Sequence, residues 1–235
     1  MKNVDFTNIC INDDFWSGRQ KQSLIVGIEA CANNLKSSIE NFEKDARVIA
    51  GDDYTKYEMQ SNFAADSDVY KLIESMAYAY ANYKDSANAE EKAAVQKISN
   101  YLNEWIPKIA AAQFADGYLN SLFTLHNEYG GGAGGTETGL TKSDRFKILG
   151  WHEFYCAGHL YEAAIAVYNS TGDMRLLEVS VKNFNLLYDI FITGNHTTYD
   201  PGEWTEPGHE EIELALIKLA PVLGNIEKYG KPYSD

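Results

Sequence analysis

Residues 156–173 read CAGHLYEAAIAVYNSTGD, a polar opening followed by a small, apolar helical stretch that stops at a glycine. Two other segments share the polar opening and the apolar helical stretch. GHEEIELALIKLAPVLG at 208–224 also stops at a glycine, whereas DVYKLIESMAYAYANYKD at 68–85 ends in Lys84-Asp85. Superposing residues 156–173 on residues 208–224 places apolar residues on apolar residues and Gly172 on Gly224. A helical unit that recurs with polar residues at one end predicts a ring of helix hairpins whose inner helices point those ends at a shared cavity.

Apolar residues at helical spacing extend this prediction along the chain, whereas strand signals are weak. The expected class is therefore all-α, with helices at about 18–44, 69–80, 89–114, 151–169, 174–192 and 209–223. Asp66-Ser67-Asp68 has the composition of a helix N-cap, and Pro107 predicts a kink or break near Ile106. Asp116-Gly117-Tyr118 and Thr171-Gly172-Asp173 are expected to be turns.

The number of helices predicts an incomplete ring. After Gly224 only a short stretch follows, so the outer helix that would complete the last hairpin has barely begun. The sequence thus predicts an arc of helix hairpins, with residues 1–235 forming a single partial domain.

The net charge and the amino-acid composition of the chain argue against some classes of binding partner. The net charge is −14 and the pI is about 4.7, which argues against nucleic acid and against an anionic membrane surface. No apolar run reaches the roughly 18 residues of a membrane span, and no signal-peptide core follows Met1, so we expect a soluble, cytoplasmic protein. Cys10, Cys31 and Cys156 are widely spaced, which indicates neither a disulfide framework nor a local zinc site.

The segment from Trp151 to His159 contains two histidines, a carboxylate and a thiol. His152 and His159 are seven positions apart and share a helix face, too far apart along the axis for one metal ion. Each could hydrogen-bond a ligand hydroxyl, as sugar sites require. The structural alternative is a capping His152 and a core His159. Cys156 is expected to be a small buried hydrophobe, although a nucleophilic role beside a histidine stays open.

The third repeated segment places His209 and the carboxylates of Glu210, Glu211 and Glu213 at a helix start. The helix macrodipole stabilises carboxylates there, and paired carboxylates could also serve general acid/base chemistry. We expect His209 to project toward the same cavity as His159. Asp68 is open to the same two interpretations, as a helix cap or as a ligand contact.

Four segments together resemble glycoside hydrolase family 127, the β-L-arabinofuranosidases. They occur in the family's order at 66–71 (DSDVYK), 116–120 (DGYLN), 152–164 (HEFYCAGHLYEAA) and 207–216 (PGHEEIELAL), within a resemblance that runs from about Phe15 to Tyr229.

The resemblance implies an (α/α)6 barrel followed by β-sandwich domains, and a retaining glycosidase acting on terminal β-L-arabinofuranosyl residues of plant-type glycans. It implies sugar binding by His159 and His209, with His152 as a further candidate. Asp68 and Glu210, at helix starts, are candidate contacts from their positions in the sequence. It also implies a nucleophilic cysteine held on zinc by further cysteines and a glutamate. No cysteine of this chain falls at a matching motif, so we expect no catalytic residue, no zinc ligand and little or no hydrolysis from this chain alone.

Two other classes stay open. The first is a non-catalytic carbohydrate-binding or split-enzyme module, completed by a second chain that carries the rest of the barrel. The other is an (α/α) barrel enzyme of a different kind, such as an unsaturated glucuronyl hydrolase or a sugar epimerase.

Overall fold

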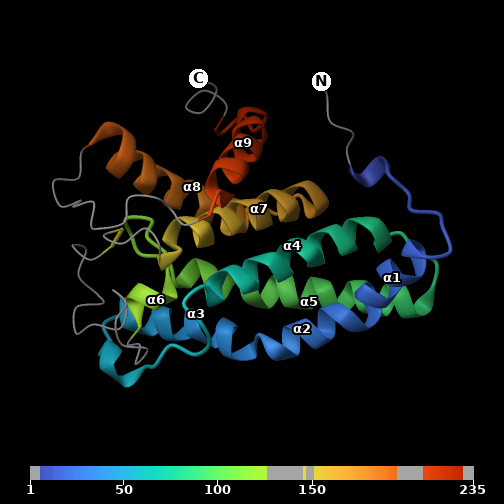
Figure 1. The fold of residues 1–235 in the computed structure, drawn as a ribbon, viewed down its shortest axis with the longest axis horizontal. Coiled ribbons are helices and arrows are strands. Elements are labelled where there is room, and N and C mark those ends of the chain that lie inside the picture. Colours follow the sequence, from blue (N-terminus) through green and yellow to red (C-terminus); the bar gives the residue numbers. More distant parts are fainter. Residues whose placement is uncertain (1–5, 126–144, 147–150, 195–208, 230–235) are drawn as a thin grey trace.

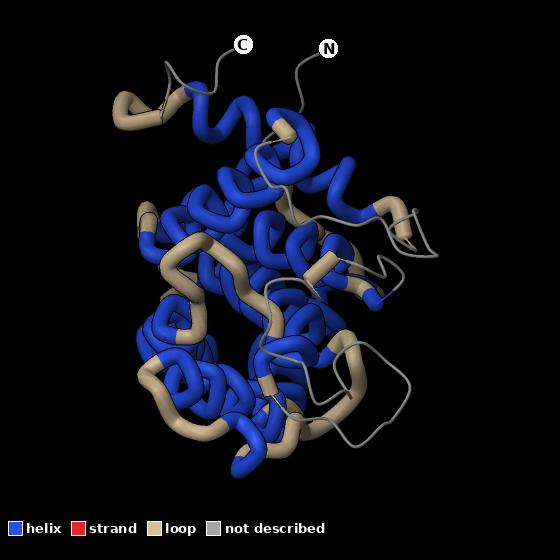
Figure 2. Tube along the Cα trace, turned by 90° about the vertical axis from the view of Figure 1, so that its left-hand side faces the viewer, coloured by secondary structure: helices blue, strands red, loops and turns tan. Residues whose placement is uncertain are grey.

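The computed structural model describes residues 6–125, 145–146, 151–194 and 209–229, and within these ranges the chain forms helices, turns and loops without a β-strand (Figure 1, Figure 2). The main helices are α1 (Trp16–Gln22), α2 (Ile28–Asn34), α3 (Lys36–Ile49), α4 (Ala65–Tyr83), α5 (Ala89–Ala111), α7 (Glu153–Thr171), α8 (Arg175–Tyr188) and α9 (Glu211–Gly224). Shorter pieces are η1 (Phe6–Asn8), η2 (Ser23–Gly27), η3 (Tyr54–Lys56), α6 (Ser121–Thr124) and η6 (Asp189–Thr193). The all-α prediction is confirmed.

The three repeated segments form three neighbouring helices, α4, α7 and α9, with α7 in the middle (Figure 1). Helices α5 and α8 follow α4 and α7 along the chain, and each contacts its predecessor and the other. The molecule therefore has an inner row of helices backed by an outer row, which is the hairpin arrangement of an (α/α)6 barrel. The predicted turn between α7 and α8 is present, since Gly172 has a φ of +78° and ends α7.

Helix α7 is buried on nearly all sides because most of its residues are small or aliphatic. Ala163, Ala164 and Val167 have no exposed surface, so α4 and α9 can pack closely on opposite sides of the helix. The first turns of α7 carry Glu153, Tyr155 and His159, and the last two contribute to the site described below.

Two local predictions need correction. Of the kink or break predicted at Pro107, the break is absent: helix α5 continues through Pro107, and the side chains of Ile106 and Ile109 on either side of the proline are buried in the core. The expected helix at 18–44 is interrupted by the π-helical η2 and by Leu35, which separates α2 from α3.

Asp66 is not an N-cap, which corrects a third prediction. Helix α4 starts at Ala65 with Ala64 as its cap, and Asp66 lies inside the first turn and is buried. Its Oδ2 accepts a hydrogen bond of 2.8 Å from the backbone N–H of Ser121, whose hydroxyl donates to Asp45 at 2.6 Å. Asp66 therefore ties α4 to α6, and burial raises its pKa to about 6.

The glycine-rich stretch Gly130–Gly135 and the loop at 195–208 lie outside the described residues. No helix of the described ranges has the length and apolar content that crossing a membrane requires.

Candidate functional site

The start of α9 lies directly on α7 because residue 158 is a glycine. A Cβ built at Gly158 would lie 2.7 Å from Cγ of Glu211 and 3.0 Å from the backbone nitrogen of Ile212, closer than a side chain can approach. The missing side chain lets the first turn of α9 dock beside His159. His159 of α7 and Glu211 of α9, which are far apart in the sequence, are thereby brought together.

An aromatic cluster surrounds Tyr155 in the first turn of α7. Its ring centre lies 4.5 Å from that of His159, 5.1 Å from that of His209 and 5.4 Å from that of His152. His152 and His209 are themselves 5.0 Å apart, and Phe63 lies 4.7 Å from His152. The three histidines selected from the sequence thus gather around one phenol ring.

His152 introduces α7 through an unusual backbone conformation. Its φ is +68°, in the left-handed region that non-glycine residues rarely adopt, and its side chain makes no capping hydrogen bond. His152 therefore occupies the N-cap position of α7, as the structural alternative predicts, but its side chain does not cap the helix. With the backbone in this conformation, the ring of His152 contacts the rings of Phe63, Tyr155 and His209.

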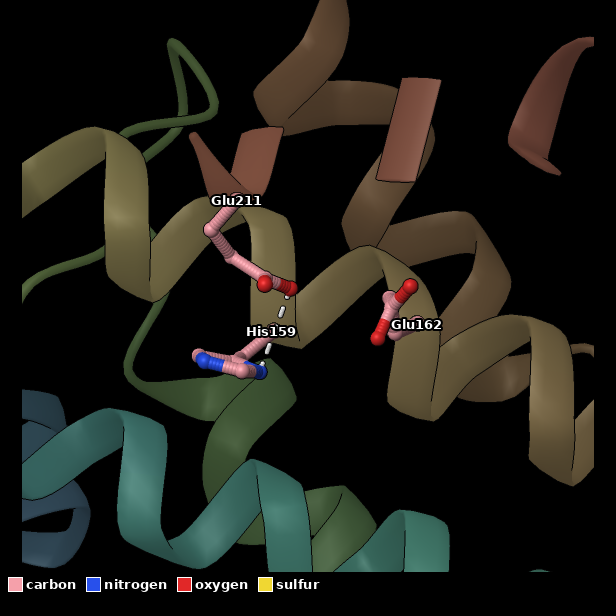
Figure 3. Close-up of side chains that lie close together, drawn as sticks. All are labelled: His159, Glu162 and Glu211. Carbon is pink, nitrogen blue, oxygen red and sulfur yellow. Dashed lines mark ion pairs between the residues drawn. The ribbon is translucent and has the colours of Figure 1, made fainter. Parts of the chain in front are cut away.

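Deeper in the site, His159 meets Glu211 (Figure 3). The Nδ1 of His159 lies 3.2 Å from Oε1 of Glu211, and 12% and 14% of the two side chains are exposed. The angles at this contact are not those of a hydrogen bond, and neither these two atoms nor Nε2 of His159 has a hydrogen-bond partner within the described ranges. Three buried polar atoms are thus open to pairing with each other or with a ligand.

Burial sets the charge of this pair. Removal from water, together with the ammonium groups of Lys71 and Lys218, lowers the pKa of His159 to about 4. Removal from water and the carboxylates of Glu162 and Glu74 raise the pKa of Glu211 to about 7. The imidazole is therefore neutral at neutral pH, and the contact is not a salt bridge despite its short distance.

The other site candidates lie outside this core. Asp68 is half-buried and forms an ion pair of 3.5 Å with Lys71, whose ammonium stands 4.8 Å over the ring of Tyr155. Asp68 therefore reaches the cluster only through Lys71. Glu210 is exposed at the start of α9 and makes no capping hydrogen bond, so the structure does not bring it into the cluster.

One group of side chains could hold a metal ion among the described residues. Single ligand atoms of His159, Glu162 and Glu211 lie within 4.8 Å of one another, a donor set that suits zinc. Lys218 of α9 already contacts Glu162, however, and its ammonium competes with a cation. The group contains no thiolate, so it does not fit the cysteine-based zinc site that the family resemblance implies.

The cysteines take no part in the site. Cys156 is buried and burial raises the pKa of its thiol, which disfavours the nucleophilic thiolate. Cys10 and Cys31 are exposed.

The sequence does not single out Tyr155, Lys71 or Lys218, and for Glu211 it predicts either stabilisation by the helix dipole or general acid/base chemistry, not a contact with His159. Tyr155 was accessible from spacing, since it lies four residues before His159 and on the same face of the helix. No comparable spacing in the sequence predicts the contact between α7 and α9.

Comparison with known proteins supplies the family. Residues 8–229 match the model described as β-L-arabinofuranosidase, GH127 catalytic domain. The chain belongs to glycoside hydrolase family 127. The GH127 resemblance read from the four motifs is confirmed, over nearly the same range.

Individual GH127 proteins show the same relationship. The chain is 31% identical to a non-reducing end β-L-arabinofuranosidase of Bifidobacterium longum subsp. longum, over 90% of this chain and 31% of that protein. A crystal structure of a GH127 β-L-arabinofuranosidase from Geobacillus stearothermophilus T6 matches with a TM-score of 0.68 and 29% identity, over 97% of this chain and 32% of that one. A second GH127 β-arabinofuranosidase structure matches with a TM-score of 0.68 and 28% identity. The chain spans about a third of the length of these relatives.

Proposed function

We propose that this GH127 segment forms one wall of the sugar-binding site of a β-L-arabinofuranosidase, with terminal β-L-arabinofuranosyl residues of plant-type glycans as ligand. The observation that carries the proposal is the gathering of His159, His209 and His152 around Tyr155 at the ends of α7 and α9. Family membership supports a carbohydrate as the substrate class.

The chemistry of the cluster suits a neutral, hydroxyl-rich ligand. A neutral imidazole offers one donor and one acceptor, which matches a sugar hydroxyl that both donates and accepts. His159 is neutral at physiological pH, and its buried Nε2 has no partner among the described residues. The ring of Tyr155 adds an aromatic surface for the C–H face of a sugar. We assign His159 and His209 as the main contacts and His152 as the next.

The described carboxylates do not make a convincing hydrolytic pair. The carboxylates of Glu162 and Glu211 lie close together, but Glu162 forms an ion pair with Lys218 and Glu211 contacts the imidazole of His159. Glu153 is buried beneath Tyr118 and the backbone of Phe146. We therefore propose that the acid/base, the nucleophile and any zinc come from outside this chain, and that Asp68 and Glu210 act at most at the rim.

Calorimetric titration of the chain with methyl β-L-arabinofuranoside tests the proposal. We expect measurable binding that weakens about tenfold in His159→Ala and in His209→Ala, as the loss of about 1.4 kcal/mol of hydrogen bonding predicts. Glu213→Ala, an exposed change on α9, is the matched control and keeps the affinity. Absence of binding to the folded wild-type chain would remove the proposal. Hydrolysis of an aryl β-L-arabinofuranoside by the chain alone, unaffected by a zinc chelator, would overturn the assignment of no catalytic residue.

A second candidate, a split-enzyme module, is favoured by the outer surface of α9. Leu214 is 54% exposed and Ile217 is 73% exposed, although both are large and apolar. A second chain carrying further helices of the ring would cover them. Co-expression with a polypeptide equivalent to the remainder of a GH127 relative should yield a stable complex, which Leu214→Asp with Ile217→Asp should abolish. A cytoplasmic location stays a prediction.

A further inference from the structure

We propose that Glu211 is a positioning residue that fixes the tautomer of His159, holding the proton on Nδ1 so that Nε2 presents a lone pair to the ligand. This inference rests on the proposed sugar site and deepens it. It predicts that the ligand group facing Nε2 is a hydroxyl acting as hydrogen-bond donor.

The first step is the position of the two atoms. Oε1 of Glu211 lies 3.2 Å from Nδ1 of His159, on the side of the imidazole away from Nε2 (Figure 3). The distance is already that of a hydrogen bond, so the inferred bond needs only a change in the relative orientation of the carboxylate and the imidazole. Two unpaired buried groups would each cost about 1–3 kcal/mol, so pairing between them is strongly favoured.

The second step is rigidity. The close approach of α9 to Gly158 fixes the backbone of Glu211 against α7, one residue before His159. The ring of Tyr155 meets the imidazole edge to face at 87°, which limits rotation of the ring. Carboxylate and imidazole are therefore held by separate packing contacts, as a positioning pair requires.

The third step is charge. The groups around the pair are Lys71 and Glu74 on α4, Glu162 on α7 and Lys218 on α9. Lys218 contacts Glu162 and Lys71 pairs with Asp68. Removal from water and the carboxylates of Glu162 and Glu74 raise the pKa of Glu211 to about 7, so Glu211 is ionised above that pH. Above neutral pH the Glu211 carboxylate can only accept a hydrogen bond. The neutral imidazole must then place its proton on Nδ1 to satisfy it.

Nitrogen-15 NMR of the full chain at about pH 8, without sugar, tests the inference directly. Long-range proton–nitrogen spectra distinguish a protonated from an unprotonated ring nitrogen, and His159→Gln identifies the His159 signals by their loss. We expect Nδ1 protonated and Nε2 unprotonated in the wild type and in Glu213→Ala, a matched loss of one carboxylate from the first turn of α9. In Glu211→Ala we expect both tautomers to be populated.

A wild-type spectrum with the proton on Nε2 overturns the inference, and so does a folded Glu211→Ala with an unchanged tautomer. The wild-type spectrum decides the question even if Glu211→Ala fails to fold. Because no sugar is present, the result is independent of the proposed function: an Nδ1–H tautomer without sugar binding would remove the sugar site and keep the positioning role. If sugar binds, Glu211→Ala should weaken binding about five- to tenfold, as one misaligned hydrogen bond predicts.

Discussion

Gly158 and Glu211 are in a contact that no larger residue at position 158 would allow, with Cγ of Glu211 2.7 Å from the place of a Cβ. The docking of α9 on α7, and with it the 3.2 Å contact between His159 and Glu211, depends on this missing methyl group.

Gly158→Ala should therefore destabilise the fold by about 1–3 kcal/mol, because the backbone of α9 must move to relieve the overlap. Urea unfolding followed by circular dichroism measures the loss. Gly18→Ala is the control, since a Cβ at Gly18 meets nothing within 4 Å and α1 tolerates alanine. Equal stabilities of the two variants would contradict the close approach of α9 to α7.

Asp66 and Asp68 look alike in the sequence and should behave differently. Asp66→Ala removes the buried acceptor of the Ser121 N–H and should lower the free energy of unfolding by about 1–3 kcal/mol. Asp68→Ala removes only a half-exposed ion pair with Lys71 and should change that free energy by about 0–1 kcal/mol. Chemical denaturation of both variants makes the comparison, and an Asp68 effect as large as that of Asp66 would refute it.

These residues also show where sequence reasoning stops. Apolar periodicity and Gly172 locate α7 to within two residues at each end, because helix formation and termination are local. The roles of Asp66 and Glu211 depend on partners in other segments, Ser121 and His159, which no spacing rule connects. His159 and His209 could be selected because the repeat places them at corresponding helix ends, and His152 because it lies seven positions before His159.

Pro107 shows a related limit. A proline inside a helix loses one hydrogen bond and costs about 3 kcal/mol, which predicts a break. Burial of Ile106 and Ile109 against the core offsets that cost in α5. Packing of this kind is a property of the assembled helices and is not visible in the local sequence.

Stability should fall as the pH rises from about 5 to 8. Burial raises the pKa of Glu153 and Glu211 to about 7 and that of Asp66 to about 6. At a pH between the ordinary pKa of each carboxyl group and its raised pKa, the folded chain therefore binds more protons than the unfolded chain. The lowered pKa of His159 acts in the opposite direction between about 4 and 6.5, but it is one group against three. Thermal unfolding should give a lower Tm at pH 8 than at pH 5.5.

Glu153→Gln tests the contribution of Glu153 to that slope. Glutamine resembles the protonated carboxyl group that burial favours, and its oxygen can still accept the 2.8 Å hydrogen bond from the backbone N–H of Phe146. The difference in Tm between pH 5.5 and pH 8 should shrink in this variant and persist in the exposed control Glu213→Gln. An undiminished difference in Glu153→Gln would show that Glu153 is ionised in the folded chain across this range.

The tautomer of His159 should reverse as Glu211 takes up a proton. The Glu211 carboxylate accepts the Nδ1 proton above its pKa of about 7, whereas the protonated carboxyl group below it donates to Nδ1 and moves the imidazole proton to Nε2. His159 itself stays neutral down to about pH 4, so the exchange is between two neutral forms. Nitrogen-15 spectra recorded from pH 8 to pH 5.5 should show the Nε2 signal becoming protonated with a midpoint near 7 in the wild type and in Glu213→Ala. An Nδ1–H tautomer that persists to pH 5.5 would mean that Glu211 stays ionised, and that the carboxylates of Glu162 and Glu74 do not raise its pKa as their proximity requires.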